Sequence, residues 1–474
     1  MAVSELTEST VKIEIKGMDA AFVVPSGTSL YDVYQEIKNK ISYPVMAGVI
    51  DNNLIDFHYR FYDSCQLELV DISTETGLKI YRRSTVFLLL KACQELFPGR
   101  KLIVKHSLSN GLFCEFLDGE SNESEVAAIQ EKMKDLQAHD LPINKLVVRT
   151  GDACRIFAEQ DKEDKVKLLE YRNKDEVHVY EMDGFYEYFY GYMVSRTSSI
   201  NEFRVLNYPP GIILQTPEIN KPGILQPYIP QKKLASVFAE AKRWAEMLRT
   251  PHLAALNDMV KQGQINDIIR VNEALHEKKI ANIADICSRD IRLVLISGPS
   301  SSGKTTFAQR LLIQLKVNGH NPVSISLDNY FINRDKTPRD ENGDYDFESL
   351  DALNLELFND HLGRLIRGEE VEIPVYNFKT GTSEPGGIFI RVPDGEPIII
   401  EGIHGLNDRL TWTVPREQKF KIYVSALTQL NIDNTNRIPT TDSRLIRRII
   451  RDNRTRGHNA LNTIKRWPSV RRGE

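Results

Sequence analysis

The 474-residue sequence has few cysteines, five in all, and no long apolar run. The cysteines are widely separated and form no CxxC pair, which excludes a disulfide framework and is typical of a reducing compartment. The longest apolar runs, residues 86–90 and 397–400, fall far short of the roughly 18 residues of a membrane span. The first ten residues lack the basic and apolar regions of a signal peptide. We therefore expect a cytoplasmic protein with no membrane association.

An excess of charge of one sign is also lacking. The 61 basic and 65 acidic residues leave a formal net charge of −4. Coating of nucleic acid requires a strongly basic surface, so any contact with nucleic acid would need a local patch. At about 150 residues per domain, the length predicts roughly three domains.

The first domain is predicted from alternating and helical patterns between residues 11 and 70. Val11–Ile15 alternates apolar and polar residues, as a half-buried strand does. Apolar residues at helical spacing follow from Ser29 to Ile41, with Thr28 or Ser29 as the N-cap. The other predicted strands are residues 21–24, 47–50 and 66–70. This ββαββ order predicts a β-grasp domain.

A second α+β domain is predicted from about residue 74 to 215. It contains an apolar helix at 85–96 and a densely aromatic stretch at 185–192. The aromatic stretch is either a core or interface strand or a platform on which bases stack. Prolines and glycines at 209–230 then indicate a linker, and residues 232–289 have the apolar spacing of helices.

A strand, a glycine-rich loop and a helix follow one another from residue 291. The apolar run 291–297 is typical of a parallel strand buried on both faces. The loop Gly298-Pro-Ser-Ser-Ser-Gly-Lys-Thr-Thr306 has the G-x4-G-K-[ST] pattern in its required context. Its amides and the helix N-terminus favour bound phosphate, while Lys304 reaches the β/γ oxygens and Thr305 faces Mg²⁺. The predicted nucleotide-binding residues are Gly298, Ser300, Ser301, Ser302, Gly303, Lys304, Thr305 and Thr306.

Three more predicted strands end near polar side chains. Asp328 follows the strand 322–327, Tyr376 ends a strand that begins at 370, and Glu401 ends an apolar strand. Parallel α/β sheets place their sites at the carboxyl ends of strands. A carboxylate there can accept a proton from an attacking hydroxyl or hold Mg²⁺, although Asp328 alone could equally be a helix cap. Convergence on one phosphate loop favours the catalytic interpretation.

The C-terminal stretch is basic. Residues 437–472 contain ten arginines and Lys465 against Asp442 and Asp452. The alternatives are a solvated helix face, an RNA-binding patch, or a lid whose arginines neutralise a transferring phosphoryl group. The phosphate loop favours the lid.

These motifs resemble the uridine kinase and phosphoribulokinase family from about residue 291 to 474. The phosphate loop matches, and Ser326–Phe331 resembles the strand end that carries the catalytic aspartate. Tyr345-Asp346 resembles the family's stretch that grips the ribose hydroxyls, and residues 374–378 resemble its nucleobase loop. Residues 401–404 resemble the strand end on the metal side, and residues 447–457 resemble the lid.

The resemblance implies transfer of the γ-phosphoryl of ATP, with Mg²⁺, to the 5′-hydroxyl of a nucleoside, a pyrimidine nucleoside being favoured. Asp328 would be the base, and Lys304 would stabilise charge together with the lid arginines. The implied lid residues are Arg448, Arg451 and Arg456; the implied substrate residues are Asp346, Tyr376 and Phe378; and the implied surroundings of Mg²⁺ are Thr305, Asp328 and Glu401.

Two positions depart from the family pattern. Uridine kinases place a histidine that reads the pyrimidine edge a few residues beyond the loop tyrosine, and here that position is about Gly381. Their second lid arginine, just after the Arg-Gly pair, is here His458. Loss of a hydrogen-bond partner for the base weakens the discrimination between nucleobases more than it affects the phosphoryl transfer itself. The chain also ends before the last strand and helix of such kinases, so we expect a C-terminally incomplete kinase domain.

The N-terminal half resembles other proteins. Residues 11–70 resemble a TGS domain, and about 74–215 resemble the second domain of threonyl-tRNA synthetases. That domain edits mischarged tRNA with two histidines and a later Cys and His, whose positions fall here near Arg83, Phe87, Phe189 and Met193. None of these is a good zinc ligand. We expect a retained fold without editing chemistry that serves as a binding, regulatory or scaffolding module.

The sequence thus predicts a multidomain α+β and α/β protein. Its predicted parts are a TGS-like β-grasp domain (1–72), a synthetase-editing-like α+β domain without metal ligands (73–215), a linker with helices (216–289), and a P-loop kinase domain with a parallel sheet (290–474).

Three functional hypotheses remain open at this point. The first is an ATP-dependent nucleoside kinase with a regulatory half that binds RNA or a small molecule, expected to be a homo-oligomer. The second is a nucleotide-responsive RNA- or ribosome-associated binding protein. The third is a kinase of a phosphorylated sugar. Asp328, Asp346 and Tyr376 together favour the first, because a pure switch needs no carboxylate that grips a hydroxyl.

Overall fold

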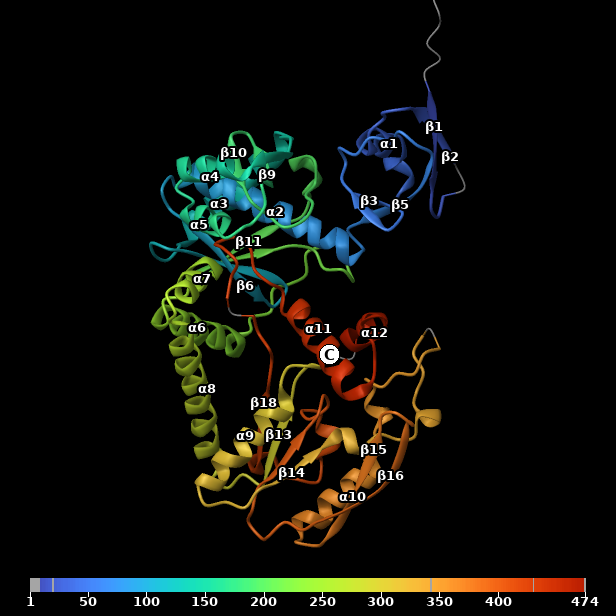
Figure 1. The fold of residues 1–474 in the computed structure, drawn as a ribbon, viewed down its shortest axis with the longest axis vertical. Helices are drawn as coiled ribbons and strands as arrows, with labels where there is room; N and C mark the ends of the chain where they lie inside the picture. Colours follow the sequence, from blue (N-terminus) through green and yellow to red (C-terminus); the bar gives the residue numbers. More distant parts are fainter. Residues whose placement is uncertain (1–8, 19–20, 342, 429, 473–474) are drawn as a thin grey trace, which may run out of the picture. The chain divides into compact units, whose positions relative to one another are not determined.

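The computed structural model describes residues 9–18, 21–341, 343–428 and 430–472. The chain divides into two compact units (Figure 1). The N-terminal unit consists of residues 1–263 together with 429–437, and the C-terminal unit consists of residues 264–428 and 438–474. The second unit therefore contains the phosphate loop and the basic stretch, while a short segment late in the chain belongs to the first.

The N-terminal unit begins with a small sheet and one helix. The elements are β1 (Thr10–Ile15), β2 (Ala21–Pro25), α1 (Leu30–Ile37), β3 (Val45–Ile50), β4 (Asn53–Ile55) and β5 (Cys65–Asp71). The sheet order is β2-β1-β5-β3-β4, with β1 parallel to β5. Ser29 caps α1 in a reciprocal capping box with Asp32. The α+β expectation for this region, with its β-rich start, is confirmed.

Two antiparallel sheets pack around a long helix in the rest of this unit. The elements are α2 (Glu75–Leu96), β6 (Leu102–Leu108), β7 (Gly111–Phe116), α3 (Glu123–Ala138), β8 (Asn144–Arg149), α4 (Thr150–Glu159), α5 (Glu163–Glu170), β9 (Glu176–Met182), β10 (Phe185–Glu187), β11 (Arg204–Tyr208) and β12 (Gly211–Gln215). The sheet orders are β10-β9-β8 and β11-β12-β7-β6. Helix α2 begins earlier than predicted, because Thr74 caps it and Leu78 and Tyr81 are buried on it.

The aromatic stretch 185–192 is mostly core. Only Phe185–Glu187 is a strand, and Phe185, Tyr188 and Phe189 are each at most 5% exposed. Buried rings cannot stack on bases, so of the two interpretations the core packing applies to these three residues. The predicted helices downstream are α6 (Lys232–Met247) and α7 (Leu253–Lys261) in the N-terminal unit, and α8 (Ile265–Cys287) in the C-terminal unit.

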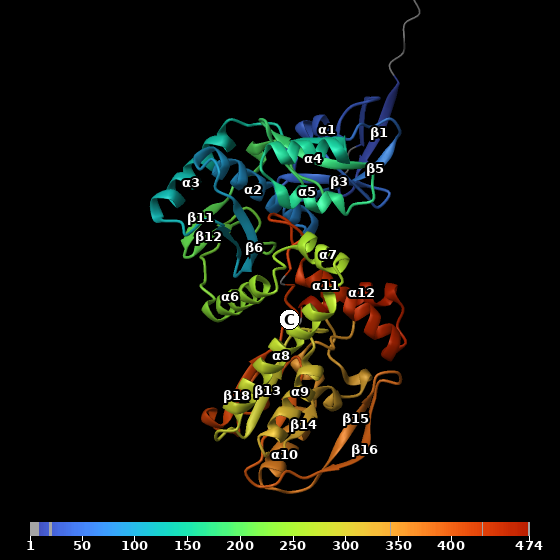
Figure 2. The same cartoon turned by 60° about the vertical axis from the view of Figure 1, so that its left-hand side comes forward.

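A four-stranded parallel sheet forms the centre of the C-terminal unit. Its order is β14 (Val323–Ser326), β17 (Ile398–Glu401), β13 (Leu293–Ser297) and β18 (Lys419–Tyr423). The strand β13 is fully buried because α8 and α9 (Lys304–Val317) pack on one side of the sheet, with Ile280 and Leu311 in the same cluster as Val294. On the other side, Leu293 and Ile400 pack with α10 (Leu355–Ile366). Figure 2 shows α8 and α9 beside β13 and β14. The predicted parallel sheet is confirmed.

Two elements of this unit lie outside the parallel sheet. Among the strands that the structure describes, β15 (Val371–Asn377) pairs only with β16 (Thr382–Ile390), as an antiparallel hairpin. The expectation that the strand before Tyr376 ends at the edge of the central sheet is therefore wrong. After the sheet come α11 (Thr440–Arg451), a π-helical turn at Asp452–Arg456 and α12 (Ala460–Arg472). Within the described residues, every helix is too short or too polar to cross a membrane.

Candidate active site

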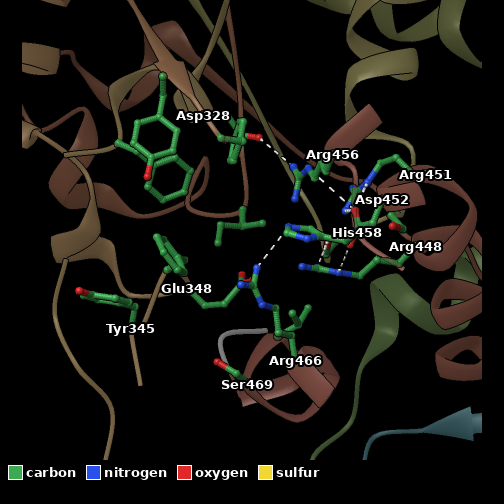
Figure 3. Close-up of a pocket in the computed structure, with 18 of the residues that line it drawn as sticks. Asp328, Tyr345, Glu348, Arg448, Arg451, Asp452, Arg456, His458, Arg466 and Ser469 are labelled. Atoms are coloured by element: carbon green, nitrogen blue, oxygen red, sulfur yellow. Dashed lines mark hydrogen bonds and ion pairs between the residues drawn. The ribbon is translucent and has the colours of Figure 1, made fainter. Parts of the chain in front are cut away.

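A cavity of about 1120 Å³ opens in the C-terminal unit beyond the carboxyl ends of β13, β14 and β17 (Figure 3). Most of the predicted site residues line it, although they come from distant parts of the sequence. They are Ser300, Ser301, Gly303, Lys304, Thr305, Thr306, Asp328, Tyr376, Phe378, Glu401, Arg448, Arg451 and Arg456. Gly298, Ser302 and Asp346 are not among the lining residues.

The phosphate loop needs its two glycines for different reasons. A Cβ on Gly298 would lie 2.0 Å from the carbonyl oxygen of Val424, so only glycine allows this close approach. Gly303 has a φ of +107° immediately before α9, a conformation that side chains rarely adopt. The loop thereby delivers the N-terminus of α9, with its positive partial charge, to the cavity.

Polar atoms of the loop fit a phosphate ligand. The hydroxyl oxygens of Ser301 and Ser302 are buried and have no hydrogen-bond partner among the residues that the structure describes. Lys304 donates to the carbonyl oxygens of Gly298 (2.9 Å) and Pro299 (3.3 Å). Burial lowers the pKa of Lys304, while Glu401 and Asp328 oppose this shift. An unpaired buried hydroxyl is costly, and a phosphate in the cavity would satisfy that of Ser301, which lines the cavity.

Glu401 links the phosphate loop to the next strand. Its Oε1 accepts hydrogen bonds from Thr305 Oγ1 (3.2 Å) and Ser326 Oγ (2.8 Å). The side chain is buried, which raises its pKa, and the nearby charge of Asp328 raises it further. Oxygen donors from Thr305 and Glu401 next to a phosphate loop are the kind of set that Mg²⁺ takes, since it keeps several waters and substrate oxygens. These residues therefore fit the implied metal.

Asp328 lines the cavity next to Arg456 of the basic stretch. It stands in the 3₁₀ turn after β14, with its side chain about half exposed. Its Oδ2 is 3.8 Å from Nη2 of Arg456, whose guanidinium carbon lies 4.6 Å from the ring centre of Phe378. A half-exposed carboxylate beside a fixed cation stays available as a proton acceptor.

The basic stretch contacts the phosphate loop in part. Arg444 Nε donates to the carbonyl oxygen of Ser300 (3.0 Å), and Arg448 Nη1 donates to its hydroxyl (2.7 Å). Asp452, which is 2% exposed, pairs with Arg448, with Arg451 (2.9 Å) and more distantly with Arg456 (3.9 Å). Figure 3 shows Arg456 reaching toward both Asp328 and Asp452. One buried carboxylate thus orients three arginines toward the cavity.

Another cation, Arg334, packs against Gly381, the sequence position at which the family's base-reading histidine would be expected. Its Nη2 donates to the carbonyl oxygen of Phe378 (2.8 Å), and its backbone N–H donates to that of Gly381 (2.8 Å). A Cβ on Gly381 would lie 2.7 Å from Cζ of Arg334, and Gly381 has a φ of +81°. The side chain of Arg334 therefore fills the space that a larger residue 381 would need.

The aromatic wall beside Arg334 is built from three rings. Phe331, Tyr376 and Phe378 pack edge-on or tilted, with ring centres 5.1 to 6.1 Å apart. Burial raises the pKa of Tyr376. Such a wall can cover the face of a flat ring in a substrate.

Asp346, the predicted ribose-gripping residue, has a local role in this structure. Its Oδ1 accepts from the backbone N–H of Glu348 (3.1 Å), and its own N–H donates to Pro338. The acidic residues of this segment that line the cavity are Asp340, Asp344 and Glu348. A grip of Asp346 on substrate hydroxyls stays a prediction.

Sequence reasoning assigned no role to several lining residues, chiefly Arg334, Glu348 and Asp452. For Asp452 a signal was present, because it stands four residues from both Arg448 and Arg456, the spacing of ion pairs on a helix. Arg334 and Glu348 stand in loops without periodicity, and only the folded chain brings them to the cavity.

Four residues stand at the positions where the resemblance to editing synthetases would require metal ligands, and they lie in the N-terminal unit. Phe87 packs against Phe189, with ring centres 5.8 Å apart, and both belong with Met193 to the buried core. Arg83 donates to the carbonyl oxygen of Tyr192. No cluster of three or more His, Cys, Asp or Glu side chains that could hold a metal ion occurs in the described part of the chain.

The comparisons with known proteins agree with a two-part chain. Residues 293–472 match the model of the phosphoribulokinase/uridine kinase family. The N-terminal region matches threonyl-tRNA synthetases: the threonine–tRNA ligase of Geobacter sp. (strain M21) is 29% identical over 183 residues, 38% of this chain and 29% of that protein. The chain spans just under a third of the length of the curated relatives it matches.

Two solved structures are similar to smaller parts of the chain. A protein described as a possible uridine kinase from Bacillus stearothermophilus is 23% identical, with 28% of this chain and 70% of that chain covered and a TM-score of 0.24. D-glycerate 3-kinase from Cryptococcus neoformans is 17% identical, with 27% and 52% covered and a TM-score of 0.22. The family match supports a P-loop kinase domain at residues 293–472.

Proposed function

We propose that the protein transfers the γ-phosphoryl group of ATP to the 5′-hydroxyl of a nucleoside, with a pyrimidine nucleoside favoured. The observation that carries the proposal is the position of Asp328, in one cavity with the phosphate loop and next to Arg456 and Phe378. With ATP on the phosphate loop, a carboxylate at this place would have the phosphoryl donor on one side and an acceptor in the cavity on the other.

The residues of the chain divide the work of the reaction. Asp328 takes the proton of the acceptor hydroxyl. At the same time the oxygen of that hydroxyl bonds to the γ-phosphorus of ATP, and the bond between the γ-phosphorus and the oxygen that leaves with ADP breaks. Lys304, Arg448, Arg451 and Arg456 face the negative charge of the transferring group. Thr305, Glu401 and Asp328 would hold Mg²⁺, which would supply positive charge next to the transferring phosphoryl group.

The aromatic wall supports a nucleoside as acceptor. Phe331, Tyr376 and Phe378 offer an apolar surface on which a planar base can rest. Arg334 at its border offers only donors, which complement carbonyl oxygens of a base.

Arg334 also favours a second candidate, a phosphorylated sugar as acceptor. A guanidinium binds a phosphate through two hydrogen bonds, and Arg334 and Lys379 both line the cavity. A panel of nucleosides and sugar phosphates, each tested for phosphoryl transfer from Mg-ATP, decides between the two. Transfer to uridine or cytidine supports the proposal. Transfer only to a sugar phosphate contradicts it and leaves the phosphotransferase chemistry intact.

For the N-terminal unit we propose a binding or regulatory role, with RNA or a small molecule as the ligand. Its similarity to a tRNA ligase supports RNA. A filter-binding assay with tRNA, in the wild type and in Lys304→Ala, tests this: association that persists when ATP binding is lost assigns it to the N-terminal unit.

A further inference from the structure

The lid arginines that line the cavity differ in what neutralises their charge. They are Arg447, Arg448, Arg451 and Arg456. Asp452 pairs with the last three, at 3.2, 2.9 and 3.9 Å. Arg447 makes no ion pair and no side-chain hydrogen bond with any residue that the structure describes. Its charge therefore has no carboxylate partner in the described part of the chain.

Arg447 stands on the face of α11 that turns toward the phosphate loop. Arg444 and Arg448 both donate to Ser300, at 3.0 and 2.7 Å, and on a helix positions 444, 447 and 448 share one face. Arg448 is 8% exposed and also donates to Asp452, so protein atoms already occupy its guanidinium. The side chain of Arg447 is exposed and open to a ligand.

The guanidinium of Arg447 lies beside the second glycine of the loop. Its Nη2 is 3.6 Å from the position that a Cβ on Gly303 would occupy. Gly303 is the N-cap of α9, and Lys304 is the first residue of that helix. The positive end of α9 and the cation of Arg447 therefore meet, which is unfavourable unless an anion lies between them.

The position beside Gly303 also indicates which part of a nucleotide would be bound. The backbone amides of a phosphate loop hold the α- and β-phosphates, while its lysine reaches the β- and γ-phosphates. Arg456 lies instead beside Asp328, at 3.8 Å, where the transferring group would meet the acceptor. The lid thus presents one cation to the loop and another to the site of transfer.

We propose that Arg447 binds the phosphates of ATP that remain in ADP, reaching them from the lid over Gly303. A guanidinium can donate two parallel hydrogen bonds to one phosphate group. The phosphate would neutralise both Arg447 and the positive end of α9, and would hold α11 against the loop. The inference rests on the proposed function only in taking ATP as the ligand of the phosphate loop.

Arg447→Met tests the contact, because it removes the charge from an exposed position and leaves no buried cavity. The control is Arg454→Met, which removes another exposed arginine of the basic stretch that does not line the cavity. Isothermal titration calorimetry of the full chain measures the dissociation constants for ATP and ADP. We expect Arg447→Met to raise both about tenfold, the effect of losing hydrogen bonds from a charged group, and Arg454→Met to change neither.

Two further readouts sharpen the test. Arg447→Lys keeps the charge and loses the planar fork, so its affinities should fall between those of the wild type and Arg447→Met. In turnover, the KM for ATP should rise by the same factor as the dissociation constant, with the loss confined to KM, because the contact is made equally before and during transfer.

Unchanged affinities in Arg447→Met overturn the proposal. A loss confined to ATP also overturns it, because that result would place the contact on the γ-phosphate. An equal loss in Arg454→Met overturns it as well, since it would show only the general positive potential of the lid. Binding needs no acceptor. A wild-type protein that binds ATP and transfers its phosphoryl group to no acceptor would therefore contradict the proposed function, while the binding of ATP and ADP would still decide the role of Arg447.

Discussion

The guanidinium of Arg456 lies 3.8 Å from the carboxylate of Asp328, and its central carbon lies 4.6 Å from the ring centre of Phe378. The lid and the strand end that carries Asp328 thus meet at the point where a donor phosphate and an acceptor hydroxyl would react. Burial lowers the pKa of Arg456, and the neighbouring Arg451 lowers it further, while Asp328 and Asp452 oppose the shift. The carboxylates of Asp328 and Asp452 both favour the charged form of Arg456.

The first prediction concerns Asp328. Asp328→Asn should lower kcat by about 10²- to 10⁴-fold, because a positioned base is lost, while ATP binding is retained. Steady-state kinetics with Mg-ATP and the acceptor found in the panel measure this. Asp335→Asn, an exposed acid in the next turn, is the control and should change neither value. A kcat for Asp328→Asn close to that of the wild type would rule out the base.

The second prediction concerns Glu401 and pH. Burial raises the pKa of Glu401 above its usual 4.5, so the folded protein binds the proton more tightly than the unfolded chain. Stability from this group is therefore present below pH 4.5 and is lost as pH rises through the higher folded pKa. Glu401→Gln should raise the unfolding midpoint of the ligand-free protein at pH 7, with the difference shrinking on acidification.

The same substitution should lower turnover, because Glu401 is a proposed neighbour of Mg²⁺. Thermal unfolding at pH 7 and pH 4.5, beside turnover at several Mg²⁺ concentrations, separates the two effects. A variant that is less stable than the wild type at pH 7 would show that the ionised carboxylate stabilises the ligand-free fold. That result would contradict the direction of the pKa shift.

Most residues that the sequence predicts for the C-terminal site line one cavity, because the signals for them are local. A phosphate loop requires glycines at fixed spacing, and a buried parallel strand requires a continuous apolar run; both are visible in residues 291–306. Asp328 and Glu401 follow from the rule that sites lie at the carboxyl ends of strands. Tyr376 was predicted to line the site because it ends a strand of the parallel sheet. It does line the cavity, but from β15, which belongs to a hairpin outside that sheet.

What could not be predicted depends on contacts distant in sequence. Nothing local distinguishes Arg334 from other loop arginines, and its place over Gly381 depends on the packing of two loops. Likewise, Asp433 looks like any acid in a polar stretch, although it is fully buried against Lys165. Buried ion pairs between distant residues leave no periodic pattern, so only the folded chain reveals them.

The third prediction concerns Arg334. Arg334→Met should raise the KM for the acceptor roughly tenfold, the value of one or two hydrogen bonds from a charged group, with little effect on the KM for ATP. Lys336→Met, in the same exposed turn, is the control. Equal increases in both KM values would show a general disturbance of the cavity instead of a contact with the acceptor.

Gly381→Ala gives an independent test of the same contact. Residue 381 has a φ of +81°, and its new Cβ would lie 2.7 Å from Cζ of Arg334, so the guanidinium must move. We expect the same direction of change in the acceptor KM as for Arg334→Met. An unchanged KM would mean that the position of Arg334 does not matter for the acceptor.

The last prediction concerns the aromatic cluster in the N-terminal unit at the positions where editing synthetases carry metal ligands. Phe87 is 0% exposed and packs against Phe185 (5.5 Å between ring centres) and Phe189 (5.8 Å). Phe87→Ala should lower the free energy of unfolding by about 3–5 kcal/mol, because it leaves a cavity in a packed core. Urea unfolding followed by circular dichroism measures this. Val147→Ala, 57% exposed on β8, is the control and should stay within about 0.5 kcal/mol of the wild type. A loss for Phe87→Ala as small as the control's would mean that these rings surround an open, ligand-accessible site.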